Sequence, residues 1–350
     1  MKRAALIACD NGLGHVRRCY LIGLELAAHG WTVDLYAPQH KFVKFVTLFG
    51  VDHNLRNVEF STATTAECLR LGEPRALNWH RRVPSLEVYQ VVLSDNLPEV
   101  LYVRPDAILS GHFFWHDVLS ELPHAYVRQC EELIVTFQPP VVASSLFASV
   151  AVSDCRGFIP VGLYGYGQPS REAIEGNALL ITGGSTPAVK SYLETIINRM
   201  KTREPRGFQT VFVDPDLLPH GREKHLKSSI GAAQQALPAW MKPATYDNSM
   251  YSQTICAICR PGVGTVTDLL QRGARPFCLY ELGNTELSDN AHRLHGAGLG
   301  NDLETGTDPL ERAERYVRNG TERRLHGKAL ARLSFSGALE TVQIIEQLFN

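Results

Sequence analysis

The sequence of 350 residues has no apolar run of eighteen residues, and its first residues lack the apolar core of a signal peptide. It also has no excess of charge of one sign, because 35 Lys and Arg stand against 36 Asp and Glu, a formal net charge of −1. A nearly neutral chain has no bulk attraction to nucleic acid or to anionic lipid. The sequence therefore predicts a cytoplasmic protein that binds no nucleic acid and contacts membranes at most peripherally.

Motifs for metals and for common nucleotide cofactors are missing as well. The one CxxC spelling, Cys256 to Cys259, lies in an apolar run, and strand residues three apart point to opposite faces. The one DxD spelling, at 214–216, is typical of a solvated turn. No GK[ST] occurs, and the first glycine turn lacks the third glycine of a dinucleotide fingerprint. The sequence thus predicts no metal, no cofactor and no hydride transfer, with most of the eight cysteines buried and reduced.

What the sequence does contain is an alternation of apolar runs with helical periodicity, which predicts α/β structure with parallel sheets. The pattern stops between 155 and 177, where Gly, Pro and Tyr dominate, and it restarts at 178. The expected strands of the first round are 4–9, 32–37, 105–110, 125–127 and 141–143. Its main expected helices are 16–29, 41–49 and 85–102, the last interrupted near Pro98.

This alternation predicts two Rossmann-like domains with a ligand cleft between them. The expected N-terminal domain covers 1–157, a linker covers 158–176, and the C-terminal domain covers 177–335. A last amphipathic helix, 336–350, is expected to cross back to the N-terminal domain.

A glycine turn with a histidine follows the first expected strand. His15 stands at the start of the next helix, where the positive end of the helix dipole favours the neutral ring, ready to accept a proton. A capping or surface histidine is the alternative, since most of the thirteen histidines must be of that kind. The position of His15 in a turn that faces the cleft favours a catalytic role.

A second glycine turn lies late in the chain, between the apolar run 255–259 and a helix over 265–272. Gly262 and Gly264 let the backbone approach a ligand closely, and free amides at a helix N-terminus attract an anion. Asp268, one turn into the helix, can accept hydrogen bonds from a ribose diol. A plain strand-to-helix turn explains this stretch equally well by itself.

Three motifs taken together resemble those of GT-B glycosyltransferases: GxGHxxR at 12–18, GGS at 183–185, and RPGVGTVTDLLQRGARP at 260–276. The resemblance is to the GlcNAc transferase that makes lipid II and to the nucleotide-sugar hydrolase of pseudaminic acid synthesis. It implies the GT-B fold, with the acceptor in the N-terminal domain and the donor in the C-terminal domain. The implied reaction is an inverting, metal-independent transfer from a nucleotide-sugar, such as a UDP-sugar, to a hydroxyl.

The resemblance also implies roles for individual residues. His15 resembles the base that deprotonates the attacking hydroxyl or water, with Gly12 and Gly14 beside the acceptor. The implied donor-binding residues are Gly183, Gly184, Ser185, Tyr246, Arg260, Gly262, Val263, Gly264, Thr265, Asp268, Glu286 and Asn290.

The segment 111–117 combines aromatic and titratable residues after an expected strand. His112 is a candidate for the acceptor pocket, and Asp106 or Asp117 is a candidate to orient a histidine. The aromatic residues of this segment are equally explained as a cover for the sheet.

Two further functions remain open. A nucleotide-sugar hydrolase would use water in place of the acceptor, and a non-catalytic nucleotide-sugar-binding protein would keep the cleft without the reaction. Long irregular loops in the first half of the chain favour an acceptor site and therefore the transferase.

Overall fold

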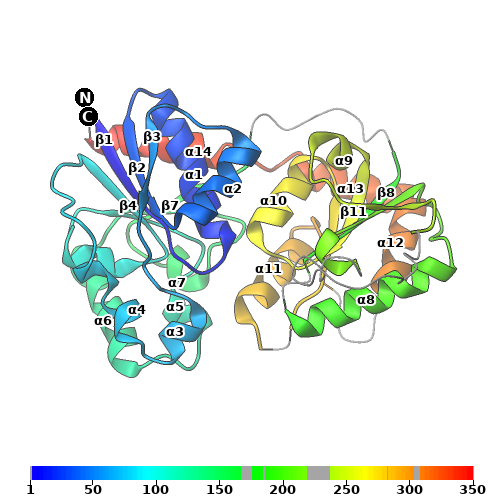
Figure 1. The fold of residues 1–350 in the computed structure, drawn as a ribbon, viewed down its shortest axis with the longest axis horizontal. Helices are drawn as coiled ribbons and strands as arrows, with labels where there is room; N and C mark the ends of the chain where they lie inside the picture. Colours follow the sequence, from blue (N-terminus) through cyan, green and yellow to red (C-terminus); the bar gives the residue numbers. More distant parts are fainter. Residues whose placement is uncertain are drawn as a thin grey trace, which may run out of the picture. The chain divides into compact units, whose positions relative to one another are not determined.

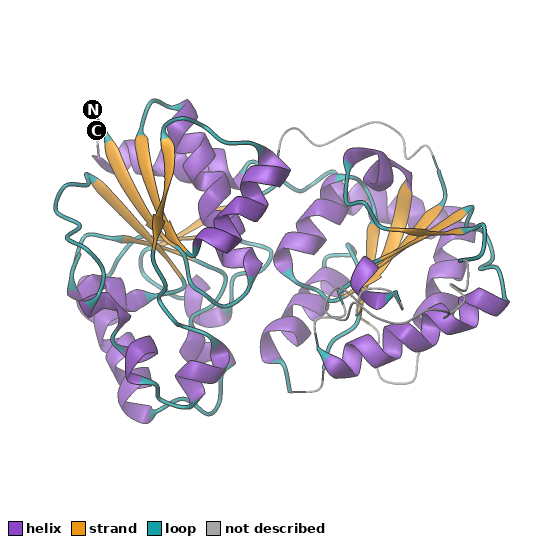
Figure 2. Ribbon diagram, viewed as in Figure 1, coloured by secondary structure: helices purple, strands orange, loops and turns teal. Residues whose placement is uncertain are grey.

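The computed structural model describes residues 2–166, 176–183, 186–218, 237–281, 283–302 and 308–349. The chain divides into two compact units. The N-terminal unit comprises Met1–Gly167 together with Ser334–Asn350, and the C-terminal unit comprises Gln168–Leu333. Each unit is a parallel sheet with helices packed on it (Figures 1 and 2). The α/β class is therefore confirmed.

The N-terminal unit is built on a seven-stranded sheet in the order β3-β2-β1-β4-β5-β6-β7, with all neighbours parallel. The chain moves outward from β1 to β3 and then continues on the other side of β1 with β4. Loops diverge at such a switch point, which leaves room for a ligand at the carboxyl ends of the strands. The strands are β1 (Arg3–Ile7), β2 (Thr32–Ala37), β3 (Leu55–Glu59), β4 (Val91–Asp95), β5 (Ile108–Ser110), β6 (Val141–Ser144) and β7 (Phe158–Val161).

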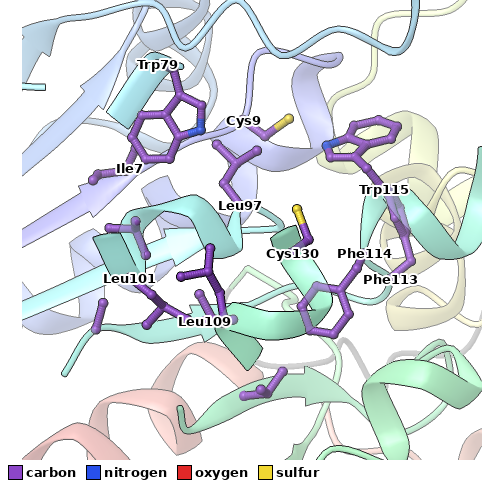
Figure 3. Close-up of a cluster of buried hydrophobic side chains, with 14 of the residues drawn as sticks. Ile7, Cys9, Trp79, Leu97, Leu101, Leu109, Phe113, Phe114, Trp115 and Cys130 are labelled. Atoms are coloured by element: carbon purple, nitrogen blue, oxygen red, sulfur yellow. The ribbon is translucent and has the colours of Figure 1, made fainter. Parts of the chain in front are cut away.

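Side chains of β1 alternate between two apolar cores, one on each face of this sheet. Leu6 lies in the core under α1, α2 and α14. Ile7 and the following Cys9 lie in the other core, together with Trp79 and Leu97 (Figure 3). The helices of this unit are α1 (Leu13–Ala28), α2 (Gln39–Phe49), α3 (Ala66–Arg70), α4 (Pro74–Leu77), α5 (Trp115–Val118), α6 (His124–Phe137), α7 (Val150–Ser153) and α14 (Gly337–Phe349), with the 3-10 turns η1 (Trp79–Arg81) and η2 (Pro98–Tyr102).

The C-terminal unit is built on a six-stranded parallel sheet in the order β10-β9-β8-β11-β12-β13. Its switch point lies between β8 and β11. The strands are β8 (Ala178–Ile181), β9 (Thr210–Val213), β10 (Met241–Pro243), β11 (Thr254–Cys259), β12 (Arg275–Cys278) and β13 (Asn301–Asp302). The helices are α8 (Pro187–Thr202), α9 (Asn248–Gln253), α10 (Val263–Gln271), α11 (Thr285–Gly296), α12 (Pro309–Arg318) and α13 (Gly320–Leu330), with the 3-10 turn η3 (Pro215–Leu217).

Two elements expected from the sequence are wrong. The stretch 85–102 is not one long helix, because it contains the central strand β4 and the turn η2. All five residues of β4 are buried, and Val91–Leu93 are apolar in succession, so the strand lacks the polar–apolar alternation that would have identified it. The expected strand 125–127 lies inside α6, where Tyr126, Cys130 and Leu133 are buried at helical spacing.

Two segments near the expected domain boundaries belong to the N-terminal unit. β7 lies within the stretch interpreted as a linker, and it pairs with β6. α14 contributes Val342 and Ile345 to the core under α1. Its first residue, Gly337, lies so close to the chain that an added Cβ would stand 2.4 Å from the carbonyl oxygen of Gly162. Glycine is therefore required where the chain returns to this unit.

The cysteines behave as the sequence predicts. All eight are free, and six of them are buried. Cys256 and Cys259 lie in different cores, because β11 presents them to opposite faces of its sheet. Among the described residues no helix is both long and apolar enough to cross a membrane.

One buried carboxyl group in this fold has a predictable effect on stability. Glu99 in η2 is completely buried, and its Oε1 accepts a hydrogen bond from the Tyr126 hydroxyl at 2.9 Å. Burial raises the pKa of Glu99 to about 7, because the charged form loses its hydration. The folded state therefore binds this proton more tightly than the unfolded state does. The stability from this group is complete below the unfolded pKa and is lost as the pH rises through about 7.

In the wild-type protein, the free energy of unfolding should fall by up to about 3 kcal/mol between roughly pH 5 and pH 8 because of Glu99. We expect Glu99→Gln to abolish this fall, because the amide does not titrate. Urea denaturation of the wild-type protein and the variant at both pH values measures this difference. If the wild-type protein and Glu99→Gln differ in stability by the same amount at both pH values, the raised pKa of Glu99 is contradicted.

Candidate active site

His15 lies in the first turn of α1, just beyond the carboxyl end of β1. Gly12 precedes this helix with a φ of 83°, a left-handed conformation that glycine adopts without strain. Asp10 fixes the start of the turn, because its Oδ2 accepts a hydrogen bond from the amide of Ala63 at 2.9 Å. The imidazole is held at the switch point of the sheet and is 9% exposed.

The His15 ring contacts Asp95, the last residue of β4. Its Nδ1 lies 2.7 Å from Asp95 Oδ1, although the two residues are 80 positions apart in the sequence. The register of the sheet explains the contact: Ile7 of β1 lies opposite Ser94 of β4, so the turn after β1 stands beside the end of β4. The carboxyl group of Asp95 is completely buried.

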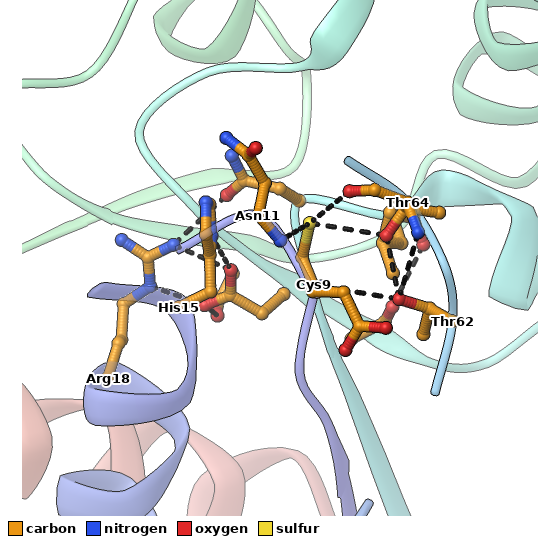
Figure 4. A network of polar contacts seen from close by, with 12 residues as sticks. Cys9, Asn11, His15, Arg18, Thr62 and Thr64 are labelled. Carbon is orange, nitrogen blue, oxygen red and sulfur yellow. Dashed lines mark hydrogen bonds and ion pairs between the residues drawn. The ribbon is translucent and has the colours of Figure 1, made fainter. Parts of the chain in front are cut away.

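Arg18, one helical turn after His15, binds the same carboxyl group (Figure 4). Its Nε lies 2.6 Å from Asp95 Oδ2, and its Nη2 lies 2.8 Å from Asp95 Oδ1. Nη2 also donates to Asn96 Oδ1 at 3.0 Å. The hydroxyl of Ser110 at the end of β5 donates to Asp95 Oδ2 at 3.3 Å. Each carboxylate oxygen therefore has at least two partners.

These contacts fix the protonation of Asp95 and the tautomer of His15. Burial by itself would raise the pKa of Asp95, but the charges of Arg18 and His15 and their hydrogen bonds lower it overall. Asp95 is therefore a carboxylate, which can only accept hydrogen bonds. Its contact with His15 requires a proton on Nδ1, so the neutral ring carries its lone pair on Nε2. His15 Nε2 makes no hydrogen bond within the described part of the chain.

Aromatic side chains surround the imidazole. The ring centroids of Phe113 and Trp115 lie 6.1 Å and 6.2 Å from that of His15. His112 is 4% exposed, and neither of its ring nitrogens has a hydrogen-bond partner among the described residues. Burial, reinforced by the charge of Arg18, lowers the pKa of His112 well below its usual range. His112 is thus a neutral polar group in an apolar wall.

A second polar cluster fixes the segment beyond β3 next to the histidine turn (Figure 4). Cys9 Sγ lies 3.3 Å from both Oγ1 and the carbonyl oxygen of Thr64. Thr62 Oγ1 lies 2.7 Å from Thr64 Oγ1 and accepts from the amide of Asp10 at 3.3 Å. The segment is therefore ordered by contacts with the end of β1.

In the C-terminal unit, the late glycine turn joins β11 to α10 as the sequence predicts. An added Cβ at Gly262 would meet no atom within 4 Å, so the turn leaves open space there. Asn290 of α11 holds the turn, because its Nδ2 donates to the carbonyl oxygen of Pro261 at 3.1 Å. Arg260 Nη2 lies 3.2 Å from Glu281 Oε2, so this arginine carries an ion pair across the turn.

Gly183 after β8 lies against this turn. Its φ is 96°, and an added Cβ would stand 2.9 Å from the amide nitrogen of Arg260. Both the conformation and the close approach require glycine. Gly184 and Ser185 lie outside the described residues.

Tyr246 is held by its hydroxyl at the end of β8. Thr182 Oγ1 donates to Asp214 Oδ2 at 3.0 Å and lies 2.7 Å from Tyr246 Oη, so the tyrosine donates to the threonine. Burial raises the pKa of Tyr246, which keeps this proton in place. Asp214 also accepts from the amide of Asp216 at 3.0 Å and caps η3. The DPD sequence therefore forms a capped turn.

Comparisons with known proteins place this architecture among solved structures. No family model and no curated protein matches the sequence. LpCGTa in complex with UDP is similar over 100% of this chain and 99% of that chain, with a TM-score of 0.67 and 12% identity. The glycosyltransferase SnogD from Streptomyces nogalater is similar over 100% and 99%, with a TM-score of 0.63 and 16% identity. Arabidopsis thaliana UGT89C1 complexed with UDP is similar over 99% of both chains, with a TM-score of 0.63 and 11% identity.

The fold is GT-B. Within this GT-B fold, the predicted catalytic and acceptor residues lie at the carboxyl edge of the N-terminal sheet, and the described donor residues of the β8 and β11 turns lie at that edge of the C-terminal sheet. Identity this low establishes the fold alone. The more specific resemblance to the lipid II and pseudaminic acid enzymes stays a prediction from the motifs.

Sequence reasoning missed two residues of this candidate site. Asp95 was hidden because its strand was interpreted as part of a helix. Arg18 is the arginine of the GxGHxxR motif, and its position three residues after His15 on one helix was a usable signal. Of the two candidates for orienting a histidine, neither Asp106 nor Asp117 contacts His15, but Asp117 lies beside His116.

Both aspartates have other partners in the structure. Asp106 pairs with Arg104. Asp117 accepts from the amide of Phe114 at 2.9 Å, and its Oδ1 lies 3.6 Å from His116 Nε2.

Proposed function

We propose that this chain is an inverting, metal-independent glycosyltransferase that moves a sugar from a nucleotide-sugar, a UDP-sugar in particular, to a hydroxyl acceptor. The observation that carries the proposal is the contact of His15 Nδ1 with the buried Asp95 carboxylate, which leaves Nε2 as a proton acceptor. UDP complexes among proteins of the same fold support the choice of donor. A cytoplasmic location is part of the proposal.

The reaction begins with proton transfer from the acceptor hydroxyl to His15 Nε2. The oxygen forms a bond to the anomeric carbon as the bond from that carbon to the nucleotide breaks, and the electron pair of this bond leaves on the diphosphate. Attack opposite the leaving group inverts the configuration. Asp95 stabilises the imidazolium that forms, because its charge lies 2.7 Å from Nδ1.

The leaving diphosphate is held in the C-terminal unit by backbone amides. The first turn of α10, which begins at Val263, presents the positive end of the helix dipole. Such preoriented dipoles stabilise the charge that develops on the leaving group. The turn residues Gly262, Val263, Gly264 and Thr265 are therefore assigned to the diphosphate.

The other donor residues are assigned around this turn. Asp268 binds the ribose, Tyr246 flanks the nucleobase, and Glu286 and Asn290 bind the sugar hydroxyls. Gly183, Gly184 and Ser185 bind near the diphosphate, as does Arg260, whose ion pair with Glu281 fixes its guanidinium at the turn.

The acceptor is assigned to the N-terminal unit, beside Gly12, Gly14 and His112. An added Cβ at Gly14 would meet no atom within 4 Å, which supports an open surface next to His15. His112 offers two buried ring nitrogens without partners in the described chain.

Hydrolysis of the nucleotide-sugar is the second candidate. The low exposure of His15, at 9%, and its two aromatic neighbours favour a small nucleophile such as water. A purely binding protein is disfavoured, because a buried His–Asp–Arg cluster is costly to desolvate and a binding function does not require it.

Incubation with UDP-, dTDP-, GDP- and CMP-sugars, with detection of free nucleotide, tests the proposal. We expect one nucleotide class to be released catalytically. Release that needs an added hydroxyl acceptor supports transfer, and equal release in buffer alone supports hydrolysis. No release from any donor, with donor binding intact and acceptors present, would contradict both reactions.

A further inference from the structure

The carboxylate that contacts His15 is shared between two cationic partners. Arg18 reaches both oxygens of Asp95, and its Nη2 meets the same Oδ1 that His15 contacts. The side chain of Arg18 is 7% exposed and that of Asp95 is 0% exposed. A buried ion pair of this kind is strong and directional, because two parallel hydrogen bonds fix the plane of the carboxylate.

We propose that Arg18 is a positioning residue that orients Asp95 toward His15 and divides its negative charge, so that Asp95 stabilises the imidazolium less than an unpaired carboxylate would. The inference rests on the proposed function, in which His15 removes the acceptor proton. An undivided buried carboxylate would bind the imidazolium tightly and keep the ring charged at rest. A charged imidazole cannot accept the proton.

Two charged side chains of the described N-terminal unit contact each other beside His15. They are Asp95 from β4 and Arg18 from α1. The other titratable groups that face them are His112 after β5, Cys9 after β1, Cys19 on α1 and Tyr164 after β7. Burial keeps all four neutral, since it lowers the pKa of His112 and raises the pKa of the two thiols and the phenol. Arg18 and His15 are the charges that lower the pKa of Asp95, and Arg18 is the permanent one of the two.

The surroundings fix the guanidinium as firmly as the carboxylate. Arg18 Nη2 donates to Asn96 Oδ1 at 3.0 Å. Asn96 has a φ of 58°, an unusual left-handed value that asparagine tolerates. An added Cβ at Gly111 would stand 1.7 Å from Asn96 Oδ1, so only glycine leaves room for this side chain. Asp95, Asn96 and Gly111 thus all support one orientation of Arg18.

The test follows the titration of the His15 imidazole by NMR in the full-length protein without substrate. Arg18→Met removes the charge and keeps an unbranched stem. We expect the midpoint of the His15 titration to rise by about one pH unit in Arg18→Met, a roughly tenfold gain in proton affinity. Arg18→Lys keeps the charge, so its midpoint should stay within about 0.3 unit of the wild-type value.

Arg17→Met is the matched control. Arg17 is the neighbouring residue on α1, is 8% exposed, and places its guanidinium 5.6 Å from the centre of the Phe49 ring. It should leave the His15 midpoint unchanged. A folded Arg18→Met protein with an unchanged midpoint would overturn the proposal. If that variant does not fold, a shift of a full unit in Arg18→Lys would overturn it equally, because the charge is retained there.

The rate of nucleotide release adds a second readout. For Arg18→Met, the acidic limb of the profile of kcat/KM against pH should move to higher pH by about one unit. Activity that is lost near neutral pH should therefore return at higher pH. If Arg18→Met lowers kcat/KM by the same factor at all pH values, the proposed division of the Asp95 charge by Arg18 is contradicted. The imidazole titration needs no substrate, so failure of the proposed reaction leaves its outcome intact.

Discussion

Replacing His15 by alanine is expected to lower the rate of nucleotide release by about a thousandfold, within the range for loss of a general base. The reason is that Nε2 is the proposed proton acceptor and Asp95 is proposed to act only through the ring. Donor affinity should change less than about twofold, because the diphosphate is assigned to the C-terminal unit. Steady-state kinetics and calorimetric binding of the donor measure the two effects separately.

His116→Ala is the matched control for this experiment. His116 also lies beside an aspartate, with its Nε2 3.6 Å from Asp117 Oδ1, but it does not contact His15 or Asp95. Its loss should change the rate by less than about threefold, an allowance for small structural effects. Full turnover by His15→Ala would remove His15 from the mechanism, and loss of donor binding in that variant would place His15 in the donor site.

Replacing Asp95 by asparagine is expected to have two large effects. The rate should fall by about a hundredfold or more, because the neutral amide no longer stabilises the imidazolium and no longer dictates the tautomer. The free energy of unfolding should fall by about 3–5 kcal/mol, because the guanidinium of Arg18 is left buried without its counter-charge. Rate measurements and urea denaturation test the two effects independently.

Asp106→Asn is the control for the second effect. Asp106 also pairs with an arginine, Arg104, but its side chain is 57% exposed. An exposed ion pair contributes less than about 1 kcal/mol, so this variant should be nearly as stable as the wild-type protein. Equal losses of stability in the two variants would contradict the importance of burial at Asp95.

The glycine turns were predictable because their signals are local. Gly12, Gly183 and Gly262 each follow an apolar run, and each stands where a strand gives way to a helix or its approach. The α/β class and the GT-B fold follow from the repeated unit and the motifs. The position of His15 at the start of a helix was likewise readable, because Gly12 and the periodicity after it define the helix.

The partner of His15 could not be read from the sequence in the same way. Its contact with Asp95 joins residues 80 positions apart, and it depends on β4 lying next to β1. Leu86, Tyr89 and Leu93 repeat at helical spacing, and this pattern concealed a five-residue strand. No local feature of Ser94-Asp95-Asn96 specifies which strand lies beside it, so the sheet order was needed to find the acid.

We propose that His15 and Asp95 act as one base. The rate of nucleotide release by the double variant His15→Ala/Asp95→Asn tests this most directly. Residues that act as a unit have strongly non-additive effects. We predict that the double variant is no slower than His15→Ala alone, to within about threefold, since Asp95 has no ring left to act on. If the two losses multiply instead, Asp95 acts independently of His15 and the account is contradicted.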